Sequence, residues 1–230
     1  MKETPPTAKP APARRRSLAG KSPKGAPRRR DEEVLEAAAR VFYRRGYADA
    51  SVQDVADEIG ILKGSLYHYI KTKEDLLFRL LEGVHEEVGT ILREVAAVPD
   101  LAPLDRLHLY VSRQVEYNAR NLMRISIYYH DVARLSDERR RAIYKQRGGH
   151  EAFVAELIRQ AQAAGEVDPE QDPQLLANCA FGNVIWVYRW YNPKGRLGPQ
   201  ALAKGAADFV VGGIRHSGAA AAAPAADLAA

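Results

Sequence analysis

Apolar side chains recur at helical spacing along almost the whole chain, apart from its two ends. The first apolar stripe begins at Val34 and continues for more than two turns until Gly46, a residue type that often ends helices. Three acids precede this stripe and are expected in the first turn, where they complement the helix dipole: Asp31, Glu32 and Glu33. The pattern predicts one amphipathic helix at the start of the folded part.

Two capping boxes mark the starts of later helices. Ser51 with Asp54 opens a helix of about two turns, because the two side chains can satisfy free N–H groups of a first turn. Thr72 with Asp75 opens a much longer helix in the same way. Residues 63–70, between them, are predicted to form a short helix. Further helices are predicted at about 103–120, 122–130, 136–164, 173–191 and 200–214.

Charge is divided unevenly along the chain. Residues 1–30 hold ten Lys and Arg and one acid, whereas the remainder holds 24 basic and 28 acidic residues. A Pro-, Ala- and Arg-rich segment cannot bury enough apolar surface to order itself, so residues 1–27 are predicted to be a disordered basic tail. This tail is either a solvated extension or an arm that binds nucleic acid. The Ala-rich residues 218–230 are predicted to form a second disordered tail.

Sequence features of enzymes and metal sites are sparse. Glu82 with His85 is a partial metal motif, but a di-iron bundle needs a second copy, so His85 is expected at the surface. No catalytic residue, metal or cofactor is predicted. The chain has one cysteine, Cys179, and lacks an apolar run long enough to cross a membrane. These features predict a soluble protein of the reducing cytoplasm with no membrane partner.

The segment between Ile59 and Lys73 contains no acidic residue. A short helix and a tight turn at Gly60 precede it, which is the layout of a helix-turn-helix unit. Its lysine, hydroxyl and imidazole groups can meet phosphates or base edges. Helical hairpins that bind no DNA also show such patterns. A helical ligand-binding or interaction protein without a DNA-regulatory role is therefore the alternative function.

The same residues resemble the Tet repressor (TetR) family of bacterial transcription regulators. The resemblance rests on residues 37–42, 51–56 and above all 63–76, and it covers about 28–80. The resemblance implies a homodimer, with an N-terminal three-helix helix-turn-helix domain at residues 28–76 whose third helix enters the major groove. A helical ligand-binding and dimerisation domain would follow at residues 77–217. The expected fold class is all-α, with about nine helices.

The resemblance also implies roles for single residues in binding double-stranded operator DNA. The implied groove-facing residues are Lys63, Gly64, Ser65 and Tyr67. The implied phosphate contacts are Ser51, Gln53, Tyr69 and Lys73. His68 joins this set because its imidazole can hydrogen-bond a phosphate or a base edge. Leu66 and Ile70 are expected in the core.

Two later pieces, residues 127–135 and 189–195, resemble a branch of the family that controls sterol and fatty-acid catabolism and responds to acyl-coenzyme A thioesters. A small hydrophobic effector needs an apolar tunnel, and the phosphates of coenzyme A need cations. The expected tunnel residues are Tyr110, Tyr117, Tyr128, Phe153 and Trp186. The expected phosphate ligands are Arg120, Arg124 and Arg189. Alternatively, these aromatic rings fill a helical core and these arginines pair with acids or solvent.

The last two predicted helices carry more apolar side chains than one core contact needs, which favours a homodimer through these helices. The expected interface residues are Leu175, Leu176, Cys179, Phe181, Ile185, Val187, Leu202, Phe209 and Val210. The leading hypothesis is a dimeric transcriptional repressor, not an enzyme. In this hypothesis a small hydrophobic effector, with an acyl-coenzyme A thioester as the candidate, releases the protein from DNA.

Overall fold

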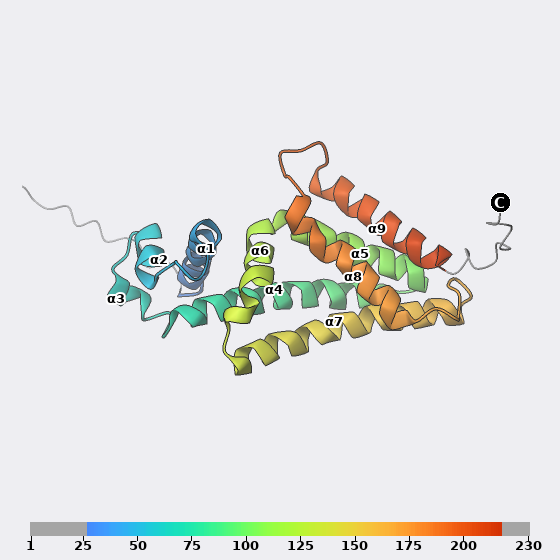
Figure 1. Ribbon diagram of the computed structural model, residues 1–230, viewed down its shortest axis with the longest axis horizontal. Helices are drawn as coiled ribbons and strands as arrows, with labels where there is room; N and C mark the ends of the chain where they lie inside the picture. Colours follow the sequence, from blue (N-terminus) through green and yellow to red (C-terminus); the bar gives the residue numbers. More distant parts are fainter. Residues whose placement is uncertain (1–26, 218–230) are drawn as a thin grey trace, which may run out of the picture.

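The computed structural model describes residues 27–217, and within this range every regular element is a helix (Figure 1). The helices are α1 (Pro27–Arg45), α2 (Val52–Glu58), α3 (Lys63–Leu66), α4 (Lys73–Ala96), α5 (Pro103–Arg120), α6 (Leu122–Asp131), α7 (Asp137–Ala163), α8 (Pro173–Trp190) and α9 (Pro199–His216). A short 3₁₀ helix, Val132–Arg134, joins α6 to α7. The predicted all-α fold class is confirmed. The two predicted tails lie outside the described residues, except for Pro27.

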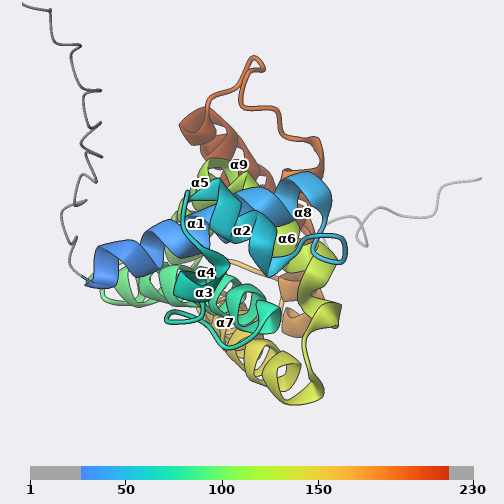
Figure 2. The same ribbon diagram turned by 90° about the vertical axis from the view of Figure 1, so that its left-hand side faces the viewer.

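Helix α4 runs through most of the length of the molecule (Figure 1). Helices α1, α2 and α3 gather at one end, and Figure 2 shows them facing the viewer. The other end is a bundle in which α5 packs against α7, α8 and α9. Helix α6 stands between the two ends and packs against both α1 and α4. The three short helices are therefore joined to the bundle through α4 and α6.

The apolar core has two parts that meet along α4. The first contains α1 to α3, the first part of α4, α6 and Ile143 of α7. The second contains α5, most of α7, α8 and α9, and takes in Val95 near the end of α4. Leu66 and Ile70 are buried in the first part, as expected from the sequence. Helix α6 thus shares a core with the short helices, although it follows them by about fifty residues in the chain.

Two element boundaries differ from the sequence prediction. Helix α1 begins at Pro27, which is favoured as a first helical residue because it has no N–H to satisfy. Asp31, Glu32 and Glu33 were expected in the first turn, but because α1 begins earlier they lie beyond it. Helix α3 ends at Leu66 instead of residue 70, and a turn follows. The chain must leave the helical conformation there because Thr72, the N-cap of α4, is extended.

Both predicted capping boxes are present, at Ser51 with Asp54 and at Thr72 with Asp75. Asp75 does more than cap α4. Its Oδ2 accepts hydrogen bonds of 2.7 Å from the backbone N–H groups of Lys71 and Thr72, and its Oδ1 accepts one from Arg139 of α7. Burial alone would raise the pKa of Asp75, but these hydrogen bonds lower it to about 2. The start of α4 is thereby tied to α7.

His85 is buried, so its expected position at the surface is wrong. Helix α4 packs against α5, α6 and α7 at once, and the face that carries His85 is covered by α6 and α7. The Nε2 of His85 lies 3.0 Å from the Tyr128 hydroxyl, and its ring stacks on that of His150 with 5.9 Å between centroids. Burial lowers the pKa of His85 to about 4, and burial also lowers the pKa of His150. Both rings are therefore neutral at pH 7.

We expect thermal stability to fall as the pH drops from about 6.5 towards 4. In this window His85 and His150 take up protons in the unfolded chain but not in the folded one. Each histidine therefore lowers the free energy of unfolding by at most about 1.4 kcal/mol per pH unit. Melting temperatures at pH 7 and pH 5 measure the loss. On acidification the melting temperature of His85→Gln should fall less than that of the parent protein. The melting temperature of His216→Gln, at an exposed position on α9, should fall as much as that of the parent protein. Equal losses in all three proteins would contradict a neutral, buried His85.

Candidate nucleic-acid interface and ligand site

The surface formed by α3 and the turn after it is polar and free of acids, and we call it the α3 surface. Lys63, Gly64, Tyr67 and His68 are exposed there, and Tyr67 keeps 48% of its surface accessible. Ser65 and Tyr69 are half-buried. Leu66 and Ile70 anchor the segment from below, because both are buried in the core shared by α1 and α2. The residues expected to contact DNA thus include a coherent exposed group.

Two acids of α2 are neutralised by arginines of α1. Asp54 of α2 pairs with Arg45 at 2.5 Å. Glu58 pairs with Arg40 at 2.7 Å and also with Arg44. These pairs fasten α2 to α1 and remove carboxylates that would repel a phosphate backbone. The α3 surface itself contains no carboxylate, and Lys63 gives it a positive charge.

Two of the expected phosphate contacts lie on α2 and its cap. Ser51 is exposed, but its hydroxyl donates to Asp54 at 2.7 Å and accepts from the Asp54 N–H at 3.1 Å. Gln53 is also exposed, and its Nε2 donates to Asp57 at 2.7 Å. Both side chains can be reached from outside. Each would exchange an existing hydrogen bond for one to a phosphate.

Lys73 is used differently from the expectation. Its Nζ donates to three backbone carbonyl oxygens of the loop between α1 and α2: those of Tyr47 at 2.8 Å, Ala48 at 3.3 Å and Ala50 at 2.8 Å. It also lies 4.4 Å from the centroid of the Tyr47 ring. An ammonium has three N–H donors, so none is left for a phosphate. In this geometry Lys73 fixes the loop instead of reaching outward.

Two exposed residues beside the α3 surface were missing from the expected set. Leu62 is 79% exposed and is the N-cap residue of α3, although the apolar pattern alone would assign a leucine to the core. Lys71 is exposed on the turn before α4. Its place in the acid-free segment was a sufficient signal for including it. Only the fold reveals Leu62.

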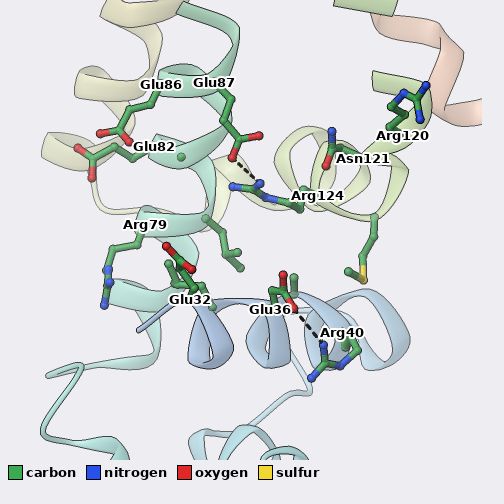
Figure 3. A pocket seen from close by; sticks show the side chains of 15 residues that line it. Glu32, Glu36, Arg40, Arg79, Glu82, Glu86, Glu87, Arg120, Asn121 and Arg124 are labelled. Atoms are coloured by element: carbon green, nitrogen blue, oxygen red, sulfur yellow. Dashed lines mark hydrogen bonds and ion pairs between the residues drawn. The ribbon is translucent and has the colours of Figure 1, made fainter. Parts of the chain in front are cut away.

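A cleft of about 800 Å³ opens between α1, α4 and the turn from α5 to α6 (Figure 3). Its apolar wall residues are Leu35, Ala39, Leu80 and Met123. Its charged wall residues are Arg40, Arg79, Arg120, Arg124, Glu32, Glu36, Glu82, Glu86 and Glu87. In Figure 3, Arg40 and Arg120 lie on the opposite side of the cleft from Glu82 and Glu86. We call this space the interdomain cleft.

Arg124 of α6 reaches α4 within this cleft. Its Nη1 donates to Glu87 at 2.6 Å, while its Nε is buried and has no hydrogen-bond partner in the described part of the chain. A Cβ atom at Gly83 would come within 2.8 Å of Arg124 Nη2, so the glycine makes room for this arginine. The second expected arginine, Arg120, is exposed and pairs with Glu116 at 2.7 Å.

Next to the interdomain cleft, inside the bundle, lies a small cavity of about 40 Å³ that we call the bundle cavity. Tyr128 lines it, as expected for a ligand site. Sequence reasoning missed its other polar wall residues, which are His85, Gln114, Asn118, Tyr129, Arg147 and His150. Helix α4 contributes Gly83 and Glu87 to the cleft and Val84 and Val88 to the cavity, so the two spaces adjoin neighbouring faces of one helix.

The other expected tunnel residues are dispersed. Tyr110 and Phe153 pack edge to face with 5.3 Å between centroids, inside the core, and do not line the bundle cavity. Tyr117 is half-buried, and burial together with the nearby Glu87 carboxylate raises the pKa of its hydroxyl. The rings therefore fill space instead of enclosing an open tunnel. Their role in binding an effector stays a prediction.

Two of the expected effector residues lie on the outside of α8. Trp186 is 58% exposed, so its expected place in an apolar tunnel is wrong. Arg189 is also exposed; its guanidinium lies 5.7 Å from the Trp186 ring and its Nη1 lies 3.4 Å from His130 Nε2. Arg189 does not line the interdomain cleft beside Arg120 and Arg124.

Helices α8 and α9 present a shared apolar groove of about 560 Å³, which we call the α8–α9 groove. Its wall includes Cys179, Trp186, Trp190 and Phe209, and the last of these is 68% exposed. Five of the residues expected at the dimer interface are instead buried in the core of the same chain: Leu176, Phe181, Val187, Leu202 and Val210. They face inward because both helices are apolar on two sides, and the sequence does not show which side packs on α5 and α7.

Other kinds of site receive no support from the described residues. Across residues 27–217, no group of three or more His, Cys, Asp and Glu side chains is arranged to hold a metal ion. No helix in the same range is long and apolar enough to cross a membrane.

Comparison with known protein families agrees with this arrangement. Residues 34–80 match the model for bacterial regulatory proteins of the tetR family, and residues 100–214 match the tetracyclin repressor-like C-terminal domain. The transcriptional repressor KstR2 of Mycobacterium tuberculosis is 31% identical over 189 residues, which cover 81% of this chain and 93% of KstR2.

Solved structures are similar over the same extent. KstR2 of Mycobacterium tuberculosis matches with a TM-score of 0.75 at 30% identity, over 80% of this chain and 94% of that one. AibR in complex with isovaleryl coenzyme A and operator DNA matches with a TM-score of 0.71 at 30% identity, over 78% and 97%. The resemblance seen in the sequence is thus confirmed, and the chain belongs to the TetR family of ligand-responsive, DNA-binding transcription regulators, a family without enzymatic activity.

Proposed function

We propose that this protein is a dimeric repressor whose operator affinity is lowered by a coenzyme A thioester bound between its two ends. The observation that carries the proposal is the interdomain cleft, which joins the DNA-binding end to the bundle and has arginines beside apolar side chains. Residues 28–76 would form the DNA-binding domain and residues 77–217 the effector and dimerisation domain. Such a regulator acts in the cytoplasm, where the operator DNA is.

The α3 surface provides the DNA contacts in this proposal. Lys63, Gly64 and Tyr67 would face the major groove, with Ser65 behind them, because they are on α3 or directly after it. The exposed Leu62 suits a thymine methyl group. Lys71, His68, Tyr69, Ser51 and Gln53 would contact phosphates on either side.

The interdomain cleft and the bundle cavity divide the effector between them. Arg120 and Arg124 would bind the phosphates of coenzyme A, since guanidinium groups bind phosphate in a bidentate manner. The acyl group would enter the adjoining bundle cavity, which must widen because about 40 Å³ is too small for an acyl chain. The AibR structure, a complex with isovaleryl coenzyme A and operator DNA, supports this class of effector.

Release from DNA would follow from the position of α6. The ion pair between Arg124 of α6 and Glu87 of α4 spans the cleft, and a phosphate that binds Arg124 competes with Glu87. Because α6 packs against α1 as well as α4, a shift of α6 reaches the DNA-binding domain directly. A coupling free energy of about 1 to 3 kcal/mol is enough to change operator affinity roughly 5- to 150-fold.

The α8–α9 groove would be the dimer interface. Its exposed residues Cys179, Gly182, Trp186 and Trp190 follow one another at helical spacing on α8, opposite Ala201, Gly205 and Phe209 on α9. Small residues beside large aromatic rings let two copies approach closely. A two-fold pairing of these two helices gives a four-helix interface that covers the apolar surface.

Lys71 and Lys73 should respond differently to substitution by methionine. Lys71→Met removes an exposed cation, so we expect a few-fold loss of operator affinity and a salt dependence whose slope falls by about 1, at unchanged stability. Lys73→Met leaves the carbonyl groups of Tyr47 and Ala50 without a donor, so we expect a loss of about 1 to 3 kcal/mol in unfolding free energy. Urea unfolding and DNA titration at several salt concentrations measure both. If Lys73→Met is as stable as the parent protein, Lys73 does not stabilise the loop between α1 and α2, and its predicted role as a phosphate contact is favoured again.

The effector is tested by fluorescence anisotropy with the full chain and a labelled duplex from the promoter of its own gene. Isovaleryl and octanoyl coenzyme A should lower affinity for this duplex at least about fivefold, while isovalerate and octanoate should not. Arg120→Met should need about tenfold more thioester and bind DNA normally. Arg113→Met is the matched control, because Arg113 lies on the same helix and pairs with Glu94 away from the cleft. Equal potency of acid and thioester would reject the coenzyme A effector.

The dimer is tested by light scattering at micromolar concentration. The parent protein should have twice the mass of one 25.5 kDa chain, and Phe209→Arg or Trp186→Arg should shift it to the monomer. Tyr144→Arg, at an aromatic residue of α7 that is exposed outside the groove, should remain a dimer. A dimer that survives both groove substitutions would exclude this interface.

A further inference from the structure

The wall of the bundle cavity contains two chemically different kinds of residue. The apolar ones are Val84, Val88, Ile125, Phe181 and Ile185. The polar ones are His85, Gln114, Asn118, Tyr128, Tyr129, Arg147 and His150. A purely hydrocarbon ligand would leave the polar residues without partners, which is costly in a buried site. The cavity is therefore built for a carbon skeleton that carries a polar group.

Gln114 is the polar residue whose hydrogen bonding is incomplete. The residue is only 8% exposed, and no donor in the described part of the chain reaches its Oε1. A buried acceptor without a donor costs roughly 1 to 3 kcal/mol. A ligand that supplies the missing donor would recover this free energy, so Gln114 is poised to recognise a group with a hydrogen to donate.

Three polar side chains that line the cavity with Gln114 have partners elsewhere. Asn118 Nδ2 donates to the Val184 carbonyl at 3.1 Å, and Arg147 Nε donates to Glu151 at 2.8 Å. The Tyr128 hydroxyl is held by His85 at 3.0 Å. None of these groups lies within hydrogen-bond distance of Gln114 Oε1. A molecule that enters the cavity can supply the missing donor.

The charge around the cavity restricts that molecule further. His85 and His150 are neutral at pH 7, and the charge of Arg147 is balanced by its pair with Glu151. The walls thus offer no free charge to match a carboxylate or an ammonium, and burial of an unmatched ion is strongly unfavourable. A neutral group fits. A ketone is neutral but brings only acceptors, so it cannot satisfy Gln114 Oε1.

We propose that the effector carries a hydroxyl group on its hydrocarbon skeleton, and that this hydroxyl donates to Gln114 Oε1 in the bundle cavity. A hydroxyl also accepts hydrogen bonds, so it suits a wall with both donors and acceptors. The carbon that bears it would lie against Val84 and Val88. The inference rests on the proposed function only in taking the bundle as the effector site. It does not require the coenzyme A part.

Carbon-matched alcohols and ketones test the hydroxyl without coenzyme A. The probes are 2-alkanols and 2-alkanones of four to ten carbons, titrated into the full chain by calorimetry. We expect the best 2-alkanol to bind at least about tenfold more tightly than its ketone, since tenfold corresponds to about 1.4 kcal/mol, within the cost of an unpaired buried acceptor. Equal affinities, tighter binding of the ketone, or no binding of any alcohol would overturn the proposal. No binding of any alcohol is also the result expected if one water molecule fills the cavity and donates the hydrogen bond to Gln114 Oε1.

Substitution of Gln114 locates the preference. Gln114→Met has nearly the same volume without the acceptor, so it should bind alcohol and ketone within about threefold of each other and keep the parent protein's affinity for the ketone. Gln114→Leu repeats the test if the methionine variant folds poorly. Gln160→Met, at an exposed position on α7, should keep the full preference. An alcohol preference that survives both Gln114 substitutions would also overturn the proposal.

Failure of the hydroxyl and failure of the coenzyme A effector give different results. If alcohols are preferred through Gln114 but no thioester lowers operator affinity, the proposed effector class is wrong and the hydroxyl assignment stands. If octanoyl coenzyme A and 7-hydroxyoctanoyl coenzyme A release DNA equally well, the effector class stands and the hydroxyl assignment is wrong. If the hydroxylated thioester is at least about fivefold more potent, both stand.

Discussion

The continuity of α4 is the constraint on which the rest of the molecule depends. Its 24 residues rise about 36 Å as one helix, from the turn after α3 to the far end of the bundle. Leu76, Leu77, Leu80 and Leu81 are buried with the short helices, while Val95 is buried with α5 and α9. Helix α4 therefore belongs to both parts of the core. In the proposed mechanism it would carry a displacement in the bundle to the α3 surface.

Helix α4 is held by different contacts at its start and near its middle. At its start, Asp75 joins the cap of α4 to Arg139 of α7 by charged hydrogen bonds, which are short-ranged and directional. Midway, the Arg124–Glu87 pair joins α4 to α6 across the interdomain cleft. Ion pairs of this kind contribute little to stability but exchange partners readily when another anion arrives. The contact of Asp75 thus fixes the start of α4, whereas the Arg124–Glu87 pair beside the interdomain cleft can be exchanged for another anion.

Local physics made much of the fold predictable from the sequence. The capping boxes at Ser51 and Thr72 and the apolar stripe of α4 depend on residues close in the chain, so their pattern predicts helix starts and buried faces correctly. Errors arose where the answer depends on distant segments. The burial of His85 follows from α6 and α7, and the role of Lys73 follows from a loop more than twenty residues earlier in the chain. The outward position of Trp186 depends on which of two apolar faces of α8 packs on α7, and periodicity does not decide this.

The polar cluster around the bundle cavity contributes less to stability than hydrocarbon would. A leucine at position 114 and apolar residues in place of His85 and His150 would remove three sets of buried polar atoms from the second half of the fold. Nothing in the helical pattern requires polar groups at these positions, and the helices around them pack well elsewhere. Buried polar groups that lower stability in this way are expected at ligand-binding sites. Because the departure is chemically specific, with one acceptor unpaired and no free charge, it constrains the ligand more tightly than cavity size does.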